Sequence, residues 1–312
     1  MSDKHRPLRA GIDMGGTGTR LILIDGLQEV AALTLPTADF AALSQQQRSV
    51  ALVAYLRQIC PVDGHIISLG IGASGPVNNK HGVIENGDTL ACFSHFPLLE
   101  EMRQQLQVPV SIDNDAVTAA LGELHAGAGT GSSRMLMVTL GTGIGVAMLD
   151  KGKPLRTHDG RHPEAGHIPV SGDSHRCYCG ITGCWEMSAS RSWLQQALKP
   201  LLPDLEWQQL SVALLLEKSE QNSLLAELFR QYGERVGRGL STLLTLYGPE
   251  ITVLSGSAAG LMPLFHSGLQ HALQRAGGYA LHPNIVTSSL GDLAGSLGAA
   301  LLPTLGEPAM HY

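Results

Sequence analysis

Apolar runs broken by glycine-rich turns mark the clearest elements of the chain. Residues 10–25 begin apolar, turn through Gly15–Thr19 and continue as a second apolar run. This order predicts a strand, a turn and a strand. Residues 135–150 repeat it, with apolar stretches on both sides of Gly141–Gly145. Two hairpins of one design indicate a duplicated fold.

The intervening and later segments alternate strands with helices. Residues 66–72 and 108–112 are predicted strands, and a helix is predicted from 116 to about 125, capped by the acidic sequence 113–115. Further on, the pattern predicts three helices and a strand that leads into Gly256. These elements cover residues 190–198, 210–216, 222–246 and 251–254.

The length of 312 residues favours two domains, since domains cluster near about 100 to 150 residues. We expect an N-terminal α/β lobe over residues 1–117 and a C-terminal α/β lobe over residues 118–296. The apolar run 297–302 is expected to return to the first lobe, so that the segment 297–312 packs on it.

Composition and charge point to a globular protein that binds small molecules. The chain is 44% hydrophobic and 15% charged, which argues against disorder. A net charge of −6 without a Lys/Arg block argues against nucleic-acid binding. The polar start of the chain does not fit a secretory signal, and no apolar run reaches the roughly 18 residues of a membrane helix. We therefore expect a cytoplasmic protein with reduced cysteines.

Three cysteines lie close together, and their spacing predicts a metal site. Cys177, Cys179 and Cys184 surround two turn glycines, which suits a tetrahedral Cys₃His zinc site. By spacing alone, His167 and His175 compete as the fourth ligand. No carboxylate stands among the ligands, which favours a structural zinc. Cys60 and Cys92 are interpreted as small apolar fillers.

The glycine turns and three aspartates could take part in phosphoryl transfer. Neither glycine turn is followed by a helix, so neither fits a Walker loop or a dinucleotide fingerprint, but backbone amides in such turns can still bind phosphate. Asp113 or Asp115 could act as a base. Asp115 is preferred because the start of the helix favours an ionised carboxylate, whereas Asp113 is better placed to cap the helix or brace the loop. Asp13 could orient Mg²⁺.

In this order, the motifs resemble the ROK family of sugar kinases and repressors from about residue 11 to 300. The motifs are Asp13-x-Gly15-Gly16-Thr17, Asp113-Asn114-Asp115, Gly141-Thr142-Gly143-x-Gly145, Glu164-x-Gly166-His167, the three-cysteine segment through Glu186, and Gly256 after a strand. Each motif is weak alone, and the ordered set is highly specific.

The resemblance implies a two-lobed, actin-like (ribonuclease H-like) α/β ATPase fold with a cleft between the lobes. It implies ATP with Mg²⁺ and a structural Zn²⁺ as cofactors, a free sugar as substrate, and a homodimer, as is common among relatives. The implied zinc ligands are His167, Cys177, Cys179 and Cys184. The implied base is Asp115, and the residues at the sugar are Gly75, Thr89, Asn114, Asp115, Glu164, His167 and Glu186. The phosphates would lie at Asp13, Gly15, Gly16, Thr17, Gly141, Thr142 and Gly143, with Gly256 near the adenosine.

Several positions depart from the family pattern. They are Gly18, Val146, Pro163, Asp88-Thr89-Leu90 and Ser257-Ala258. The expected function is ATP-dependent phosphorylation of a free hexose or N-acetylhexosamine, at the 6-hydroxyl. The alternatives are a non-catalytic sugar sensor, which the altered glycines favour, and a ROK-type transcriptional regulator. The latter would need a DNA-binding domain ahead of the first strand, where only about ten residues precede Gly11.

Overall fold

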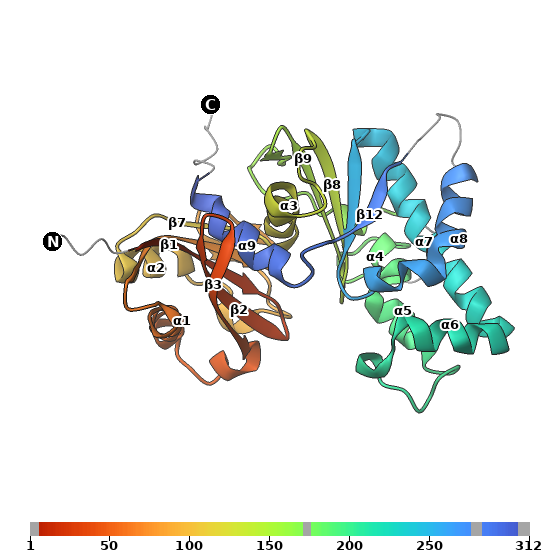
Figure 1. Cartoon of the computed structure of the whole chain (residues 1–312), viewed down its shortest axis with the longest axis horizontal. Helices are drawn as coiled ribbons and strands as arrows, with labels where there is room; N and C mark the ends of the chain where they lie inside the picture. The colour runs from red at the N-terminus through yellow and green to blue at the C-terminus, as the bar shows by residue number, and fades with distance from the viewer. Residues whose placement is uncertain (1–5, 171–175, 276–282, 305–312) are drawn as a thin grey trace. The chain divides into compact units, whose positions relative to one another are not determined.

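The chain forms two compact units in a computed structural model that describes residues 6–170, 176–275 and 283–304. Unit 1 comprises residues 1–133, 149–163 and 289–312, and unit 2 comprises residues 134–148 and 164–288. The colour gradient of Figure 1 follows the chain through these segments. The boundary expected near residue 117 falls inside α3 (Asp115–Ala126), which belongs wholly to unit 1. The helix continues through this point because residues 116–121 contain no glycine or proline that would break it.

Unit 1 is built on a five-stranded sheet in the order β3-β2-β1-β4-β7. The strand β1 pairs antiparallel with β2 and parallel with β4, which pairs parallel with β7. The strands are β1 (Arg6–Met14), β2 (Gly18–Asp25), β3 (Gln28–Pro36), β4 (Gly64–Ala73) and β7 (Val110–Asn114), with a small pair formed by β5 (Val77–Asn78) and β6 (Val83–Ile84). The turn between β1 and β2 confirms the first predicted hairpin.

Among the described residues, the α-helices that accompany this sheet are α1 (Gln45–Ile59), α2 (Leu98–Leu106), α3 and α9 (Leu293–Leu301). Short 3₁₀ turns are η1 (Thr37–Phe40), η2 (Ala91–Phe93) and η6 (Leu302–Thr304). The helix α9 packs on β1 and β4. A Cβ at Gly70 of β4 would overlap the carbonyl oxygen of Ala299, so glycine lets the backbone of α9 approach the sheet. Of the tail expected to pack here, residues 305–312 lie outside the described residues.

Unit 2 repeats this arrangement of strands. Its sheet has the order β10-β9-β8-β11-β12, in which β8 and β9 are neighbours and β11 pairs parallel with both β8 and β12. The strands are β8 (Arg134–Leu140), β9 (Ile144–Asp150), β10 (Lys153–Pro154), β11 (Ile251–Ser255) and β12 (Ile285–Thr287). The strand β9 runs across a unit boundary, and β10 belongs to unit 1. A hairpin beside two parallel strands thus occurs in both sheets, in agreement with the expected duplication.

The helices of unit 2 pack around an extensive apolar core. They are α4 (Trp185–Ala189), α5 (Arg191–Leu198), α6 (Val212–Gln221), α7 (Ser223–Tyr247) and α8 (Met262–Arg275), with 3₁₀ turns η3 (Ala165–His167), η4 (Trp207–Gln209) and η5 (Ala259–Leu261). Asn222 caps α7 through its side chain, and Gly248 ends the helix in a left-handed conformation. The helices α7 and α8 can pack closely because Gly233 has no Cβ, which would overlap the backbone of Phe265.

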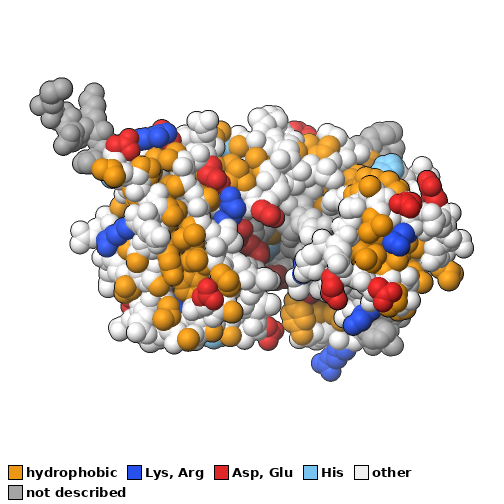
Figure 2. All heavy atoms as spheres, turned by 60° about the horizontal axis from the view of Figure 1, so that its bottom comes forward, with side chains coloured by type: hydrophobic (Ala, Val, Ile, Leu, Met, Phe, Trp, Pro, Cys, Tyr) orange, Lys and Arg blue, Asp and Glu red, His pale blue; other side chains and the backbone are white. Residues whose placement is uncertain are grey.

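The surface mixes charged, polar and apolar side chains. On the face drawn in Figure 2, lysine and arginine side chains stand singly or in small groups among acidic and apolar ones. Among the exposed large apolar side chains are Val62, Leu224 and Tyr178, of which Tyr178 lies between two of the clustered cysteines. Within the described ranges, no helix combines the length and apolar character that crossing a membrane requires.

Candidate functional site

The turn between β1 and β2 is a compact glycine turn. The Gly15 amide donates to the Gly18 carbonyl oxygen at 2.9 Å, and the Thr37 hydroxyl donates to the Gly15 carbonyl oxygen at 2.6 Å. A Cβ at Gly16 would lie 2.8 Å from the Cβ of Thr89, so the turn has no room for a side chain there. Among the described residues, no acceptor takes the Gly16 or Thr17 amide. Such amides can bind an anion.

Two carboxylates of unit 1 interact electrostatically near this turn. Asp13 lies near the end of β1, and Asp115 is the first residue of α3, directly after β7. Burial, followed by the negative charges of Asp115 and Asp292, raises the pKa of Asp13 to about 7. A Cβ at Gly295 would overlap Asp13 Oδ2, so glycine in α9 makes room for this carboxylate.

Asp115 is held in a defined position. Its Oδ2 accepts a hydrogen bond from the Ser74 hydroxyl at 2.7 Å, and its Oδ1 accepts one from the Ala116 amide at 2.8 Å. These bonds favour the ionised form, but burial outweighs them and raises the pKa of Asp115. Desolvation therefore acts against the preference for the ionised form that was expected from the start of the helix. A base with a raised pKa is also a stronger base.

Asn114, rather than Asp113, caps α3. The side-chain oxygen of Asn114 accepts from the Ala116 amide at 2.9 Å. Asp113 instead forms a forked ion pair with Arg156, and it is almost fully buried. Asp113 therefore braces the loop that follows β10, which was one of its two expected roles. It does not have the other expected role, because it does not cap the helix.

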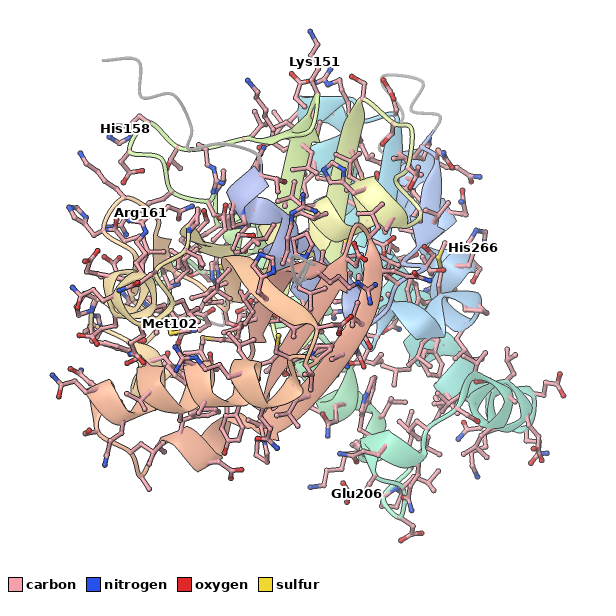
Figure 3. The ribbon with its side chains drawn as sticks, turned by 60° about the vertical axis from the view of Figure 1, so that its left-hand side comes forward. Met102, Lys151, His158, Arg161, Glu206 and His266 are labelled. Atoms are coloured by element: carbon pink, nitrogen blue, oxygen red, sulfur yellow. The ribbon has the colours of Figure 1, made fainter. Side chains whose placement is uncertain are left out.

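The loop that Asp113 braces is tied to unit 1 at a second point. Arg161 forms an ion pair with Glu85 at 2.7 Å. Figure 3 labels Arg161 and His158 on this loop. It also labels Lys151, which lies in the turn between β9 and β10. The buried His162 lies nearby, and burial, partly offset by the charge of Asp113, lowers its pKa to about 4. These contacts fix the chain just before Glu164, where it enters unit 2.

Asn86 connects two of the predicted sugar-binding residues. Its side-chain nitrogen donates to the Gly75 carbonyl oxygen at 2.9 Å and to the Thr89 hydroxyl at 2.8 Å, while its oxygen accepts from the Thr89 amide at 3.0 Å. Unit 1 therefore brings Gly75, Thr89 and the Gly16 turn into one region. Sequence reasoning missed Asn86, although the Asn86-Gly87 dipeptide is a turn signal.

The glycine turn of unit 2 lies against a carboxylate. The Gly141 amide donates to the Gly143 carbonyl oxygen at 3.0 Å. Glu186 Oε2 accepts from the Ile144 amide at 2.9 Å, and a Cβ at Gly143 would overlap that oxygen. Glycine is therefore required at Gly143 for Glu186 to reach the turn.

Gly256 approaches the same hairpin from β11. It adopts a φ of +82°, and a Cβ there would lie 2.6 Å from the Leu140 carbonyl oxygen. The Ala258 amide donates to that oxygen at 3.1 Å. The predicted adenosine-side glycine and the predicted phosphate turn are thus adjacent in unit 2.

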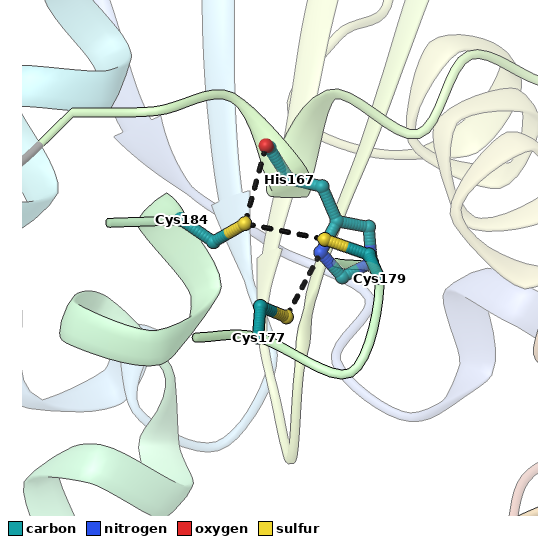
Figure 4. Close-up of side chains that lie close together, drawn as sticks. All are labelled: His167, Cys177, Cys179 and Cys184. Atoms are coloured by element: carbon teal, nitrogen blue, oxygen red, sulfur yellow. Dashed lines mark hydrogen bonds between the residues drawn. The ribbon is translucent and has the colours of Figure 1, made fainter. Parts of the chain in front are cut away.

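Four side chains in unit 2 form a candidate metal centre. The ligand atoms of His167, Cys177, Cys179 and Cys184 all lie within 4.8 Å of one another (Figure 4). Cys177 Sγ is 3.6 Å from His167 Nδ1, and Cys179 Sγ is 3.4 Å from Cys184 Sγ. A tetrahedral zinc with Zn–S bonds of about 2.3 Å separates its sulfurs by about 3.8 Å, so the cluster is compact enough to hold such an ion. The sulfur separation is too long for a disulfide.

The imidazole of His167 uses its two nitrogens differently. Nδ1 faces the thiols, while Nε2 lies 3.2 Å from the Tyr178 hydroxyl. A metal-bound histidine usually hydrogen-bonds through its other nitrogen, and Tyr178 fills that position here. Sequence reasoning missed Tyr178. The competing histidine, His175, lies outside the described residues.

Glu164 immediately precedes the turn that carries His167. The His167 amide donates to the Glu164 carbonyl oxygen at 3.1 Å. A Cβ at Gly166 would overlap the Ile144 carbonyl oxygen, so glycine lets η3 pack on the start of β9. Glu164, His167 and Glu186 therefore all lie near the β8–β9 hairpin of unit 2.

This chain is similar in sequence and structure to known sugar kinases, and in sequence to a repressor. The chain is 28% identical to a glucokinase of Streptomyces coelicolor, over 97% of this chain and 99% of the relative. A structure of a ROK family glucokinase from Streptomyces griseus, in complex with glucose and AMPPNP, has a TM-score of 0.78 and 27% identity, covering 96% of this chain and all of that one. A putative xylose repressor of Caldicellulosiruptor is 24% identical over 96% of this chain and 79% of the repressor.

The similarity extends to fold and family. The match to the Streptomyces griseus structure confirms the expected α/β, actin-like ATPase fold. The sequence matches the ROK family over residues 9–304, nearly the whole chain. Because that match spans far more than half of its length, this chain belongs to the ROK family.

Proposed function

We propose that this protein is an ATP-dependent kinase that phosphorylates a free hexose or N-acetylhexosamine at its 6-hydroxyl. The observation that carries the proposal is Asp115, a carboxylate with a raised pKa at the start of α3, fixed by Ser74. Similarity to a glucokinase over 97% of the chain supports the same reading. The direct test is a coupled ADP-release assay across a panel of hexoses and N-acetylhexosamines.

In this proposal Asp115 accepts the proton of the attacking hydroxyl. Phosphoryl transfer has a loose transition state, so positioning and charge neutralisation contribute more than base strength. The residues that would hold the sugar in this proposal are Gly75, Thr89, Asn114, Asp115, Glu164, His167 and Glu186. Exclusion of water from the bound sugar would limit wasteful hydrolysis of ATP.

The glycine turns supply the nucleotide site. The amides of Gly16 and Thr17, and those of Thr142 and Gly143, would bind the phosphates, and Gly256 would lie near the adenosine. Asp13 would hold Mg²⁺ or its waters, and the ion would neutralise charge on the phosphates. Asp13 must be ionised to do so, and its pKa of about 7 makes this step sensitive to pH near neutrality.

We further propose that His167, Cys177, Cys179 and Cys184 bind one structural zinc. Four protein ligands leave no open coordination position, so the zinc would stabilise the fold rather than activate a reactant. Its role would be to fix Glu164 and Glu186, which flank the ligands in sequence. Metal analysis of protein purified without added zinc tests this, and well under one equivalent would contradict it.

A second candidate is a sugar-binding protein without kinase activity. The observation that favours it is the similarity to a xylose repressor over 96% of the chain. The altered positions Gly18 and Ser257-Ala258 point the same way. Sugar binding by calorimetry without any sugar-dependent ADP release would favour this candidate. The cytoplasmic location and the homodimer remain predictions.

A further inference from the structure

We propose that Arg191 is a phosphate-binding residue of the nucleotide site, a role that rests on the kinase function proposed above. Arg191 is the first residue of α5, and its position places it against the glycine turn of unit 2. Neither glycine turn contains a lysine or arginine of its own. A site that binds polyphosphate needs positive charge as well as backbone amides.

Arg191 is joined to the turn at two points. Its amide donates to the Gly141 carbonyl oxygen at 2.9 Å, and its Nη2 donates to the Thr142 hydroxyl oxygen at 2.6 Å. The neighbouring Ser192 hydroxyl donates to the Thr142 carbonyl oxygen at 2.8 Å. The turn and the start of α5 therefore form one rigid structure, with the guanidinium at Thr142.

The guanidinium keeps unused capacity to bind an anion. Its Nε is buried and donates to no acceptor among the described residues. Among those same residues, no carboxylate forms an ion pair with Arg191. The guanidinium lies over the Trp207 ring, with Cζ 6.0 Å from the ring centroid. A planar donor fork without a carboxylate partner is suited to phosphate.

The bond to Thr142 also sets the direction of the hydroxyl. Because Thr142 Oγ1 accepts from Arg191, its hydrogen points away from the guanidinium and is available to an acceptor. Thr142 is exposed, and its amide and that of Gly143 donate to no acceptor among the described residues. The hydroxyl, the two amides and the guanidinium therefore lie together at this turn. We assign the β- or γ-phosphate of ATP to this group of donors.

The test compares Arg191→Gln with Arg191→Lys and with a matched control. Arg235→Gln is the control, because Arg235 also stacks on a tryptophan of unit 2, at 4.5 Å from Trp193, away from the turn. Binding of ATP, ADP, AMP and sugar is measured by calorimetry, and kcat and KM by ADP release. We expect Arg191→Gln to weaken ATP binding by about 10- to 100-fold, the loss of a charge-assisted hydrogen bond, with AMP and sugar affinity within about twofold of wild type.

Each outcome decides the assignment. Arg191→Lys should recover part of the ATP affinity, since it keeps the charge without the fork. Equal loss of ATP, AMP and sugar binding would mean that Arg191 only braces the turn, and unchanged ATP binding would overturn the proposal outright. If wild type binds ATP, weakened by Arg191→Gln, but phosphorylates no sugar, the kinase function fails and the phosphate site stands. A wild-type protein that binds no ATP refutes both.

Discussion

Replacing Asp13 by asparagine should stabilise the unliganded protein above pH 7. Asp13 has its pKa raised from 3.8 to about 7 on folding. A carboxylate whose pKa is raised on folding makes its full contribution to the free energy of unfolding below pH 3.8. That contribution is lost as the pH rises through about 7. The variant has no ionisable group at this position, so the gain in unfolding free energy should be near zero around pH 4 and largest above pH 7.

The size of this effect follows from the shift in pKa. The difference between 3.8 and about 7, at 1.36 kcal/mol for each pH unit, corresponds to about 4 kcal/mol. The side chain of Asp13 keeps some exposed surface, and solvent screening reduces such a figure. We therefore expect a gain of about 2 to 4 kcal/mol at pH 8.

Denaturant unfolding of wild type and Asp13→Asn at intervals from pH 4 to pH 8.5 measures this difference. Subtracting the two curves cancels the groups that both proteins share. Asp39→Asn, which removes an exposed carboxylate of the same unit, is the control for the loss of one negative charge. A difference for Asp13→Asn that does not change with pH would show that this carboxylate is solvated in the folded protein.

The remaining predictions concern the base, the metal and the braced loop. Asp115→Asn should lower kcat by about 10²-fold or more while sugar binding by calorimetry survives, because an amide can hydrogen-bond the hydroxyl but cannot take its proton; near-normal turnover would refute Asp115 as the base. In wild type, kcat should rise with pH through the raised pKa of Asp115, above the ordinary value of 3.8, and a profile without that limb would contradict the assignment. Cys179→Ser should lose zinc, measured by metal analysis, and lower the melting temperature, and a variant that keeps one equivalent would exclude Cys179 as a ligand. Arg156→Ala should cost about 3 kcal/mol of unfolding free energy, because it leaves the Asp113 carboxylate buried and unpaired; a loss within error would mean that water solvates Asp113.

The glycine turns were predictable because their signal is local. A run of glycines between apolar stretches specifies strand, turn and strand without help from distant residues, and both hairpins occur where expected. The start of α3 was also predicted to within one residue. Local signals were missed as well: Ser44 and Gln47 form a capping box at the start of α1 that the sequence displays.

Two arginines that sequence reasoning missed act through long-range contacts. Arg156 reaches Asp113 across 43 residues, and Arg191 reaches Thr142 across 49. Neither arginine lies in a motif, so nothing in its own neighbourhood indicates a partner. The desolvation that raises the pKa of Asp115 was not foreseen for a similar reason, since it depends on which segments pack around the carboxylate. Spacing along the chain does not contain that information.

The contacts in unit 2 also give a reason why a structural metal would matter to both substrates. Cys184 is the residue immediately before α4, and Glu186 follows two residues later. The Glu186 carboxylate accepts from the Ile144 amide and occupies the space that a side chain at Gly143 would need. Arg191 joins the same turn from α5, which begins directly after Ser190, the residue that ends α4. Loss of the metal should therefore shift Glu186 and, with it, the turn assigned to phosphate. For Cys179→Ser we accordingly expect a raised KM for ATP as well as for sugar. If the zinc supported the sugar-binding residues alone, its loss would raise only the KM for sugar.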